Sequence, residues 1–207
     1  MQFCELISLL SDTNNKPYVI EGAKPGQKVA VSPSLVGRVM GSTISGDAGT
    51  VLGWIYTPAI ERGMVDPVFN NFGGEERFWF APESGLFGLN LQGKLTGWEN
   101  YRVPEAYTSQ PFGVLASDRK SVVMHSRMGL TNAAGTDFLM DVTRTIRALD
   151  FCPYALGFGD EVDFVGFESE NLVQNVGSKP VEKETGALGA FCLTQFLTHP
   201  RTVAIAP

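Results

Sequence analysis

Short runs of apolar, β-branched and aromatic residues recur along the chain, separated by residues that favour turns. Only the N-terminus has a helical period, with Phe3, Leu6, Ile7 and Leu10 on one face, which predicts a helix over residues 3–11. Elsewhere the runs are typical of strands. The predicted strands span residues 18–21, 28–32, 37–43, 51–56, 77–81, 87–92, 112–116, 122–128, 138–149, 162–175, 186–197 and 202–205.

Residues 138–149 fit two patterns. Phe138, Val142, Ile146 and Leu149 have the spacing of a helical face, whereas apolar residues that alternate with Asp, Thr and Arg fit a strand. The two threonines in the segment and its β-rich surroundings favour the strand.

A second, short helix is predicted over residues 57–63, because Thr57 suits the N-cap, Pro58 the first turn and Gly63 the end. Otherwise strand follows strand at roughly 8–12-residue spacing. This spacing predicts a mainly β fold, an antiparallel sandwich or a large antiparallel sheet. The chain has no internal repeat, low-complexity linker or break in composition, so residues 1–207 are expected to form a single domain.

Composition and charge narrow the classes of partner. With 207 residues, 43% of them apolar and 18% charged, the chain is long enough to bury a sizeable core. A net charge of −6 without any basic run argues against nucleic acid as a partner. No stretch approaches about 18 consecutive apolar residues, so no membrane span is expected. The N-terminus lacks the basic region of a signal peptide, so we expect a cytoplasmic protein, with the periplasm as the alternative.

The three cysteines, Cys4, Cys152 and Cys192, are far apart and lack any Cys-x-x-Cys spacing. Zinc and redox motifs are therefore not expected, and buried free thiols are the favoured interpretation. The chain also lacks a P-loop, a dinucleotide fingerprint, a nucleophile elbow and a cluster of metal ligands. We therefore expect no cofactor and no metal.

Residues 70–85 combine a pair of glycines with carboxylates, an arginine and four aromatic rings. The pair Gly73-Gly74 favours a backbone that takes positive φ or approaches a neighbour closely. Alternation along the following strand places Arg77 and Trp79 on one face, and Pro82 is expected to end that strand. Such a strand is typical of the wall of a sugar site, but it suits a salt-bridged structural corner equally well.

The stretch from Gly73 to Glu83 resembles the Gly-Gly-x-x-Arg-x-Trp-x-x-Pro-Glu signature of an uncharacterised bacterial family in the galactose-mutarotase-like superfamily. Similar landmarks follow in the same order at residues 37–40, 52–55, 130–132, 167–171 and 183–186. The resemblance implies a large twisted antiparallel β-supersandwich, with a groove on one concave face that holds sugars. It implies no particular reaction.

The chain departs from that family at two places. Relatives usually continue Pro-Glu-Gly-Gly-Gln-Phe, whereas this chain has Ser84-Gly85-Leu86-Phe87 after Glu83, without the polar Gln. The chain also stops at Pro207, where relatives continue, which indicates an N-terminal fragment or a shortened member. Part of a sandwich exposes strand edges and an apolar face, which favours a homo-oligomer or a missing partner segment.

In superfamily enzymes a His generally acts as the acid and a late Glu as the base. The resemblance therefore suggests His125, in an alternating strand, and Glu168, which shares a strand face with Glu170. The alternatives are a structural or surface His and solvated or ion-paired carboxylates. His199 follows Thr198 and precedes Pro200 in a predicted turn, so it is less favoured.

A sugar or oligosaccharide is the expected ligand. The guanidinium of Arg77 can hold hydroxyls in fixed geometry, and the ring of Trp79 can stack on a sugar. The alternatives are an ion pair of Arg77 with a neighbouring Glu and a core position for Trp79. The predicted ligand-binding residues are Arg77, Glu75, Trp79, Glu83 and Asn171.

Three classes of function thus stay open from the sequence. The first is a mutarotase-like or epimerase-like sugar-processing enzyme. The second is a sugar-binding module without catalysis, and the third is a structural domain in which the Gly-Gly-Glu-Glu-Arg corner only braces the sheet.

Overall fold

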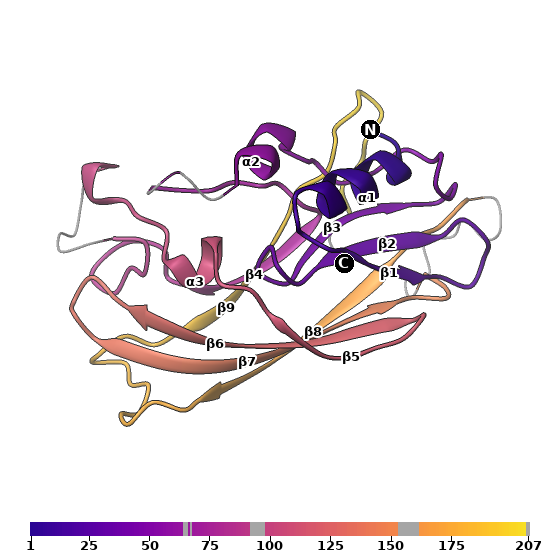
Figure 1. Cartoon of the computed structure of the whole chain (residues 1–207). Helices are drawn as coiled ribbons and strands as arrows, with labels where there is room; N and C mark the ends of the chain where they lie inside the picture. Colours follow the sequence, from indigo (N-terminus) through magenta and orange to yellow (C-terminus); the bar gives the residue numbers. More distant parts are fainter. Residues whose placement is uncertain (64–65, 67, 92–97, 153–161, 206–207) are drawn as a thin grey trace.

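The structure is a computed structural model of the chain and describes residues 1–207 apart from 64–65, 67, 92–97, 153–161 and 206–207. Its strands form two antiparallel sheets that pack face to face (Figure 1). One sheet has the strand order β1-β2-β3-β4-β9 and the other the order β5-β6-β7-β8. The mainly β sandwich predicted from the strand spacing is confirmed, as is the short helix at the N-terminus.

The first sheet consists of β1 (Tyr18–Glu21), β2 (Lys28–Ser32), β3 (Arg38–Thr43), β4 (Glu76–Ala81) and β9 (Gly189–Thr194). The second consists of β5 (Gly113–Ser117), β6 (Ser121–Thr131), β7 (Asp137–Ala148) and β8 (Phe167–Asn175). The helices are α1 (Phe3–Asp12), α2 (Thr57–Arg62), α3 (Glu105–Thr108) and the 3-10 turn η1 (Trp98–Asn100). None of the helices in the described part of the chain is long and apolar enough to cross a membrane.

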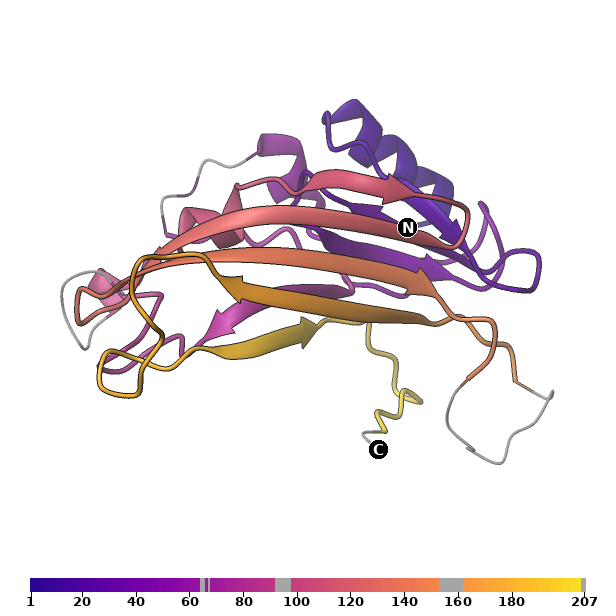
Figure 2. The same ribbon diagram turned by 90° about the horizontal axis from the view of Figure 1, so that it is seen from below.

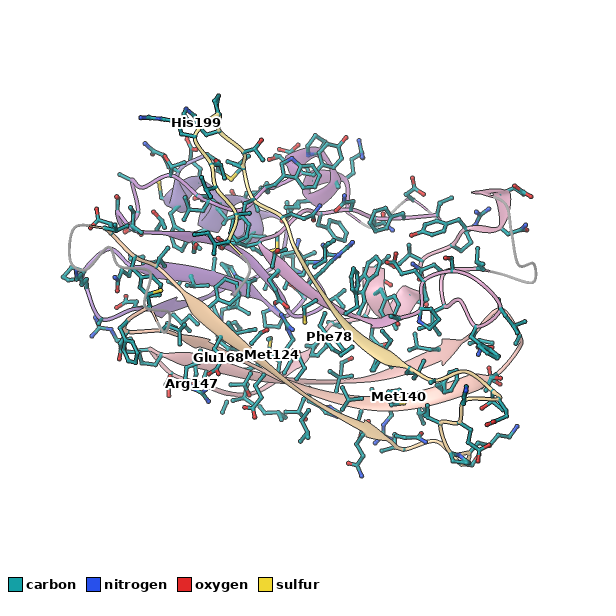
Figure 3. The ribbon with its side chains drawn as sticks, turned by 180° about the vertical axis from the view of Figure 1, so that it is seen from behind. Phe78, Met124, Met140, Arg147, Glu168 and His199 are labelled. Atoms are coloured by element: carbon teal, nitrogen blue, oxygen red, sulfur yellow. The ribbon has the colours of Figure 1, made fainter. Side chains whose placement is uncertain are left out.

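Strands β6 and β7 pair along their whole length, from Ser121 opposite Arg147 to Thr131 opposite Asp137. Their burial alternates residue by residue, so one face of the second sheet is covered and the other is open to solvent. The covered face carries residues such as Met124 and Met140, which belong to the same core as Phe78 of the first sheet (all labelled in Figure 3). The expected strand over residues 138–149 is thereby confirmed, and the helical alternative is wrong.

The first sheet is covered on both faces. Val29 and Val31 of β2 belong to the core between the sheets, whereas Ala30 belongs to a second core beneath α1 and α2. Helix α1 buries Phe3, Leu6 and Leu10 in this second core, which explains the apolar period of the N-terminus. Because two layers enclose the sheet, polar side chains on either face of β3 and β4 are removed from water.

The two glycines before β4 form a tight corner. Gly73 and Gly74 have φ angles of +76° and +103°, and a Cβ at Gly73 would lie 2.3 Å from the carbonyl oxygen of Trp54. The close approach lets the Gly74 N–H donate to Trp54 O and the Glu75 N–H to Val39 O. Both glycines are therefore required by the backbone, which confirms the expectation drawn from the pair.

Several strand predictions are wrong. Residues 51–56 pair with other segments only through single bridges at Gly53 and Ile55, and the described residues of 87–92 only through Leu91. Residues 202–205 form no strand, and the predicted strand over 162–175 begins only at Phe167. These apolar runs lack a continuous neighbouring strand, and a strand needs such a partner for its backbone hydrogen bonds.

The cysteines are free, as predicted, but they are not buried. Cys4 and Cys192 are exposed and Cys152 is half-buried. Cys192 lies on β9, a terminal strand of the first sheet, and its Sγ is 3.9 Å from Asn171 Nδ2 of β8, a terminal strand of the second. Figure 2 shows these two strands side by side at one edge of the sandwich. The edge position exposes the thiol.

Candidate functional site

The two faces of β4 have different roles. Glu76 and Phe78 point into the space between the sheets, where Glu76 reaches Arg144 of β7. Arg77 and Trp79 point to the outer face, where Tyr107 of α3 stacks on Trp79. The prediction that Arg77 and Trp79 share one face of the strand is confirmed by the contact of the Arg77 guanidinium with the Trp79 ring.

A buried ion pair joins the two sheets. The Arg144 guanidinium is fully buried and its Nη2 donates to Glu76 Oε2. Its Nε donates to the carbonyl oxygen of Gly37 at 2.9 Å and its Nη1 to Asn171 Oδ1 at 2.7 Å. Burial lowers the pKa of Arg144 to about 10, so this guanidinium stays charged at neutral pH. Asn171, which we predicted to bind a ligand, is thus placed as a partner of this ion pair.

Glu75 is buried on the outer face of the first sheet, at 1% exposure. Its Oε1 accepts a hydrogen bond of 2.8 Å from the Ser42 hydroxyl, while its Oε2 has no hydrogen-bond partner among the described residues. Burial raises the pKa of Glu75 to about 7, against the effect of the Ser42 hydrogen bond. The carboxyl group therefore titrates near neutral pH, and its side-chain partner among the described residues is the Ser42 hydroxyl of β3.

Arg77 is 8% exposed, and its guanidinium lies over aromatic rings. The carbon Cζ is 3.7 Å from the ring centroid of Trp79 and 5.5 Å from that of Phe69. Burial lowers the pKa of Arg77 to about 10, and the charges of Glu83 and Tyr101 oppose this shift. In the part of the chain that the structure describes, Arg77 forms no ion pair, and its Nε and Nη1 have no hydrogen-bond partner. The alternative that we weighed for Arg77, an ion pair with a neighbouring Glu, is therefore not found in this part.

Trp79 is covered rather than open. Its ring is 1% exposed and lies beneath the Arg77 guanidinium and the stacked ring of Tyr107, whose centroid is 5.0 Å away. The core position that we weighed for Trp79 is thus what the structure shows, and the ring is not free to stack on a sugar. Its Nε1 is buried without a hydrogen-bond partner among the described residues.

A further buried polar atom without a hydrogen-bond partner among the described residues is Asn90 Oδ1. The Asn90 amide Nδ2 donates to the hydroxyl of Tyr101 at 3.2 Å, and its backbone N–H donates to Glu83 O at 3.0 Å. Glu83 and Tyr101 are the two groups whose charges act on Arg77. Buried polar atoms in native proteins normally have partners, so a group of unpaired ones is informative. We name Arg77, Trp79, Asn90, Glu83, Tyr101 and Phe69 the Arg77 site.

The predicted catalytic residues His125 and Glu168 lie elsewhere, on the solvent face of the second sheet. His125 Nε2 is 3.6 Å from Asp141 Oδ1, and Glu168 accepts from Arg147 Nη1 at 2.8 Å. The strand register pairs His125 with Thr143 and Glu168 with Arg147, four residues further along β7. From the dimensions of a sheet, this offset puts the two side chains about 16 Å apart.

An acid and a base that act on one sugar ring must each lie within about 3 Å of it. The separation of His125 and Glu168 therefore does not suit a joint role, and neither residue lies near Arg77. His199 lies at the opposite side of the molecule from Glu168 and Arg147 in the view of Figure 3. It lies in a turn, as predicted, where its N–H donates to the Thr202 hydroxyl.

Two hollows on the surface are lined by described residues. One of about 430 Å³ is lined by Arg102 and Asn132, and one of about 600 Å³ lies between α1 and α2. Neither is lined by Arg77, His125 or Glu168. Within the described residues, no group of three or more His, Cys, Asp or Glu side chains could hold a metal ion.

The sequence analysis did not predict the burial of three polar residues: Arg38 of β3, Asn90, and Arg144 of β7. A signal for Arg144 existed, because it takes an inward position in β7 between Val142 and Ile146, where the pattern otherwise requires an apolar residue. Arg38 and Asn90 carry no such local signal. Their burial depends on segments far away in the sequence.

The fold and the site define a mainly β sandwich protein with a buried guanidinium on the outer face of one sheet. The chain belongs to a family of unknown function (DUF6786), whose model matches residues 1–207. No curated protein and no solved structure matches the sequence.

Proposed function

We propose that the protein binds a carbohydrate at the Arg77 site. The observation that carries the proposal is the group of buried polar atoms that have no hydrogen-bond partner among the described residues: Nε and Nη1 of Arg77, Nε1 of Trp79 and Oδ1 of Asn90. Each such atom costs about 1–3 kcal/mol if it stays unpaired. A bound polar molecule that pairs these atoms offsets this cost.

The chemistry of these atoms suits a sugar. Sugar hydroxyls both donate and accept hydrogen bonds, and the site offers the donors of Arg77 and Trp79 beside the acceptor of Asn90. Phe69, which packs edge-on against Trp79 with ring centroids 6.0 Å apart, supplies an apolar surface for the ring of a sugar. The resemblance to the galactose-mutarotase-like superfamily supports the same ligand class.

Access requires a movement of side chains, because the unpaired atoms are enclosed. Phe69 is only partly buried and lies over the Arg77 guanidinium, so it is the group that must swing aside. Replacing Phe69 by Ala should therefore speed association of the sugar without removing the hydrogen-bonding groups.

The proposal is limited to binding. Sugar mutarotation needs an acid and a base on one ring, and His125 and Glu168 lie too far apart to supply both. A structural role for the glycine corner is the second candidate. It is favoured by the bonds of Arg38 to Gly73, Glu75 to Ser42 and Glu76 to Arg144, which tie the corner to two other strands, β3 and β7.

Titration of the full chain with a panel of neutral and acidic monosaccharides and oligosaccharides, followed by the fluorescence of the tryptophans, tests the proposal. We expect saturable binding by at least one member, lost in Arg77→Met and kept in Arg119→Met. Arg119 is the matched control, since its side chain is exposed and pairs only with Glu21. Absence of saturable binding across the panel would leave the structural role as the better account.

A further inference from the structure

Two arginines lie side by side on the outer face of the first sheet. The antiparallel register pairs Val39 of β3 with Glu76 of β4, and continuing it by one residue places Arg38 opposite Arg77. Side chains directly opposite in an antiparallel pair have Cβ atoms about 5 Å apart, and like charges there repel. The charge of Arg77 accordingly adds to the effect of burial on Arg38, whose pKa is lowered to about 9.

Neither charge is neutralised within the described residues. Arg38 is fully buried, its Nη1 donates to the carbonyl oxygen of Gly73 at 2.7 Å, and its Cζ lies 5.6 Å from the ring centroid of Phe72. Its Nε and Nη2 have no hydrogen-bond partner there. These two nitrogens form one edge of the guanidinium, the edge that binds a carboxylate or phosphate through two parallel hydrogen bonds.

The carboxylates nearby do not fill this role. Glu75 accepts from Ser42 and Glu76 from Arg144, so both face other groups. Glu83 acts on Arg77 through its charge, but the described residues show no ion pair between them. Among the described residues, the site therefore holds two buried positive charges and less than the matching negative charge. Burying a charge without a partner is costly, and a bound anion would offset this cost.

We infer, resting on the sugar-binding function proposed above, that the ligand of the Arg77 site carries an anionic group, a carboxylate or a phosphate, which Arg38 and Arg77 bind together. The free edge of Arg38 takes the anion in a bidentate manner, and Arg77 adds Nε and Nη1. The hydroxyls of the sugar then face Asn90 and Trp79. The ligand class is thus a sugar acid or a sugar phosphate rather than a neutral sugar.

The experiment is a calorimetric titration of the full chain at low ionic strength with D-glucuronate, D-glucose 6-phosphate, D-glucose and inorganic phosphate. We expect at least one of the two anionic sugars to bind tenfold or more tightly than D-glucose. Which of the two binds more tightly distinguishes a carboxylate from a phosphate. In Arg38→Met the tenfold preference should disappear, and raised salt should weaken the parent's binding of the anion.

A second variant guards against misfolding of Arg38→Met. Arg38→Lys keeps a donor for the Gly73 carbonyl but lacks the two-pronged edge, so it should fold like the parent and lose most of the preference. Equal affinity for D-glucose and both anionic sugars in the parent would overturn the inference and leave the sugar proposal standing. Binding of inorganic phosphate alone, lost in Arg38→Lys, would support the anion site and overturn the sugar proposal. No binding of any of the four would overturn both.

Discussion

Arg38 and Arg77 lie on the neighbouring strands β3 and β4, both buried, with Arg38 bonded to the backbone carbonyl of Gly73 and Arg77 held over the ring of Trp79. A pair of like charges in this position lowers the stability of the fold. Costly arrangements of this kind are typical of functional sites, where the ligand supplies what the protein lacks. On the same sheet, the carboxylates of Glu75 and Glu76 each accept one side-chain hydrogen bond, from Ser42 and from Arg144.

Glu76 and Arg144 form an ion pair between the sheets, so the effects of replacing them on the free energy of unfolding should be strongly coupled. Arg144→Met leaves the Glu76 carboxylate buried without its cation, which should cost about 3–5 kcal/mol in the free energy of unfolding. The double variant Glu76→Leu with Arg144→Met removes both charges and should recover most of that loss. Urea denaturation of the parent, both single variants and the double variant measures the coupling. Strict additivity of the two single effects would contradict a direct pair.

The glycine corner provides a test with an internal control. Gly73 and Gly63 have nearly the same φ, +76° and +75°, but only Gly73 has atoms within 4 Å of its missing Cβ. Gly63→Ala should therefore cost about 1–3 kcal/mol for its backbone conformation alone, because a φ of +75° with a ψ of −162° lies in a region that glycine almost alone adopts. Gly73→Ala should cost several times as much, because the Cβ meets the Trp54 carbonyl. Equal losses in thermal melts of the two variants would show that the close approach is absent in solution.

Glu75 should make stability depend on pH. Its pKa is raised by burial to about 7, so the folded chain holds this proton more tightly than the unfolded chain does. The stabilisation is complete below the ordinary Glu pKa near 4.5 and is lost as pH rises through about 7, a change of up to about 3 kcal/mol. Glu75→Gln keeps an acceptor for Ser42 and should flatten the profile of unfolding free energy between pH 4.5 and 8. Glu184→Gln, at an exposed position, is the control and should retain the slope.

The separation of His125 and Glu168 predicts that neither acts on a sugar together with the other. His125→Ala and Glu168→Gln should leave any interconversion of sugar anomers, followed by polarimetry, at the rate of the parent. Both side chains are at the solvent face, so the stability of each variant should stay within about 0.5 kcal/mol of the parent. A loss of rate in either variant would show that the solvent face of the second sheet carries an active site.

The division of β4 into an inner and an outer face followed from alternation, since the strand is regular from Glu76 to Ala81. Alternation did not predict which residues the side chains on each face of β4 contact. Glu76 and Arg144 are 68 residues apart in the sequence, and their contact depends on how two sheets pack. Likewise Arg38 becomes an opposite neighbour of Arg77 only because the corner at Gly73 and Gly74 brings β4 back beside β3.

For residues 51–56 the prediction itself was wrong, because a sequence typical of a strand forms no strand there. Their β-branched and aromatic residues favour extended structure, but the segment crosses the glycine corner and meets single residues at Gly53 and Ile55. A ladder needs a continuous partner, and whether one exists is decided by the fold rather than by local sequence.

Calorimetric titration of Arg77→Met beside the parent and Arg119→Met tests most directly whether Arg77 binds a ligand. Unfolding curves of the same samples report the stability without ligand. We predict that Arg77→Met loses the binding of the sugar while its free energy of unfolding stays equal to that of the parent or rises, because a buried charge has been removed. Arg119→Met should bind like the parent. Undiminished binding by Arg77→Met, or a marked loss of its stability without ligand, would contradict the account.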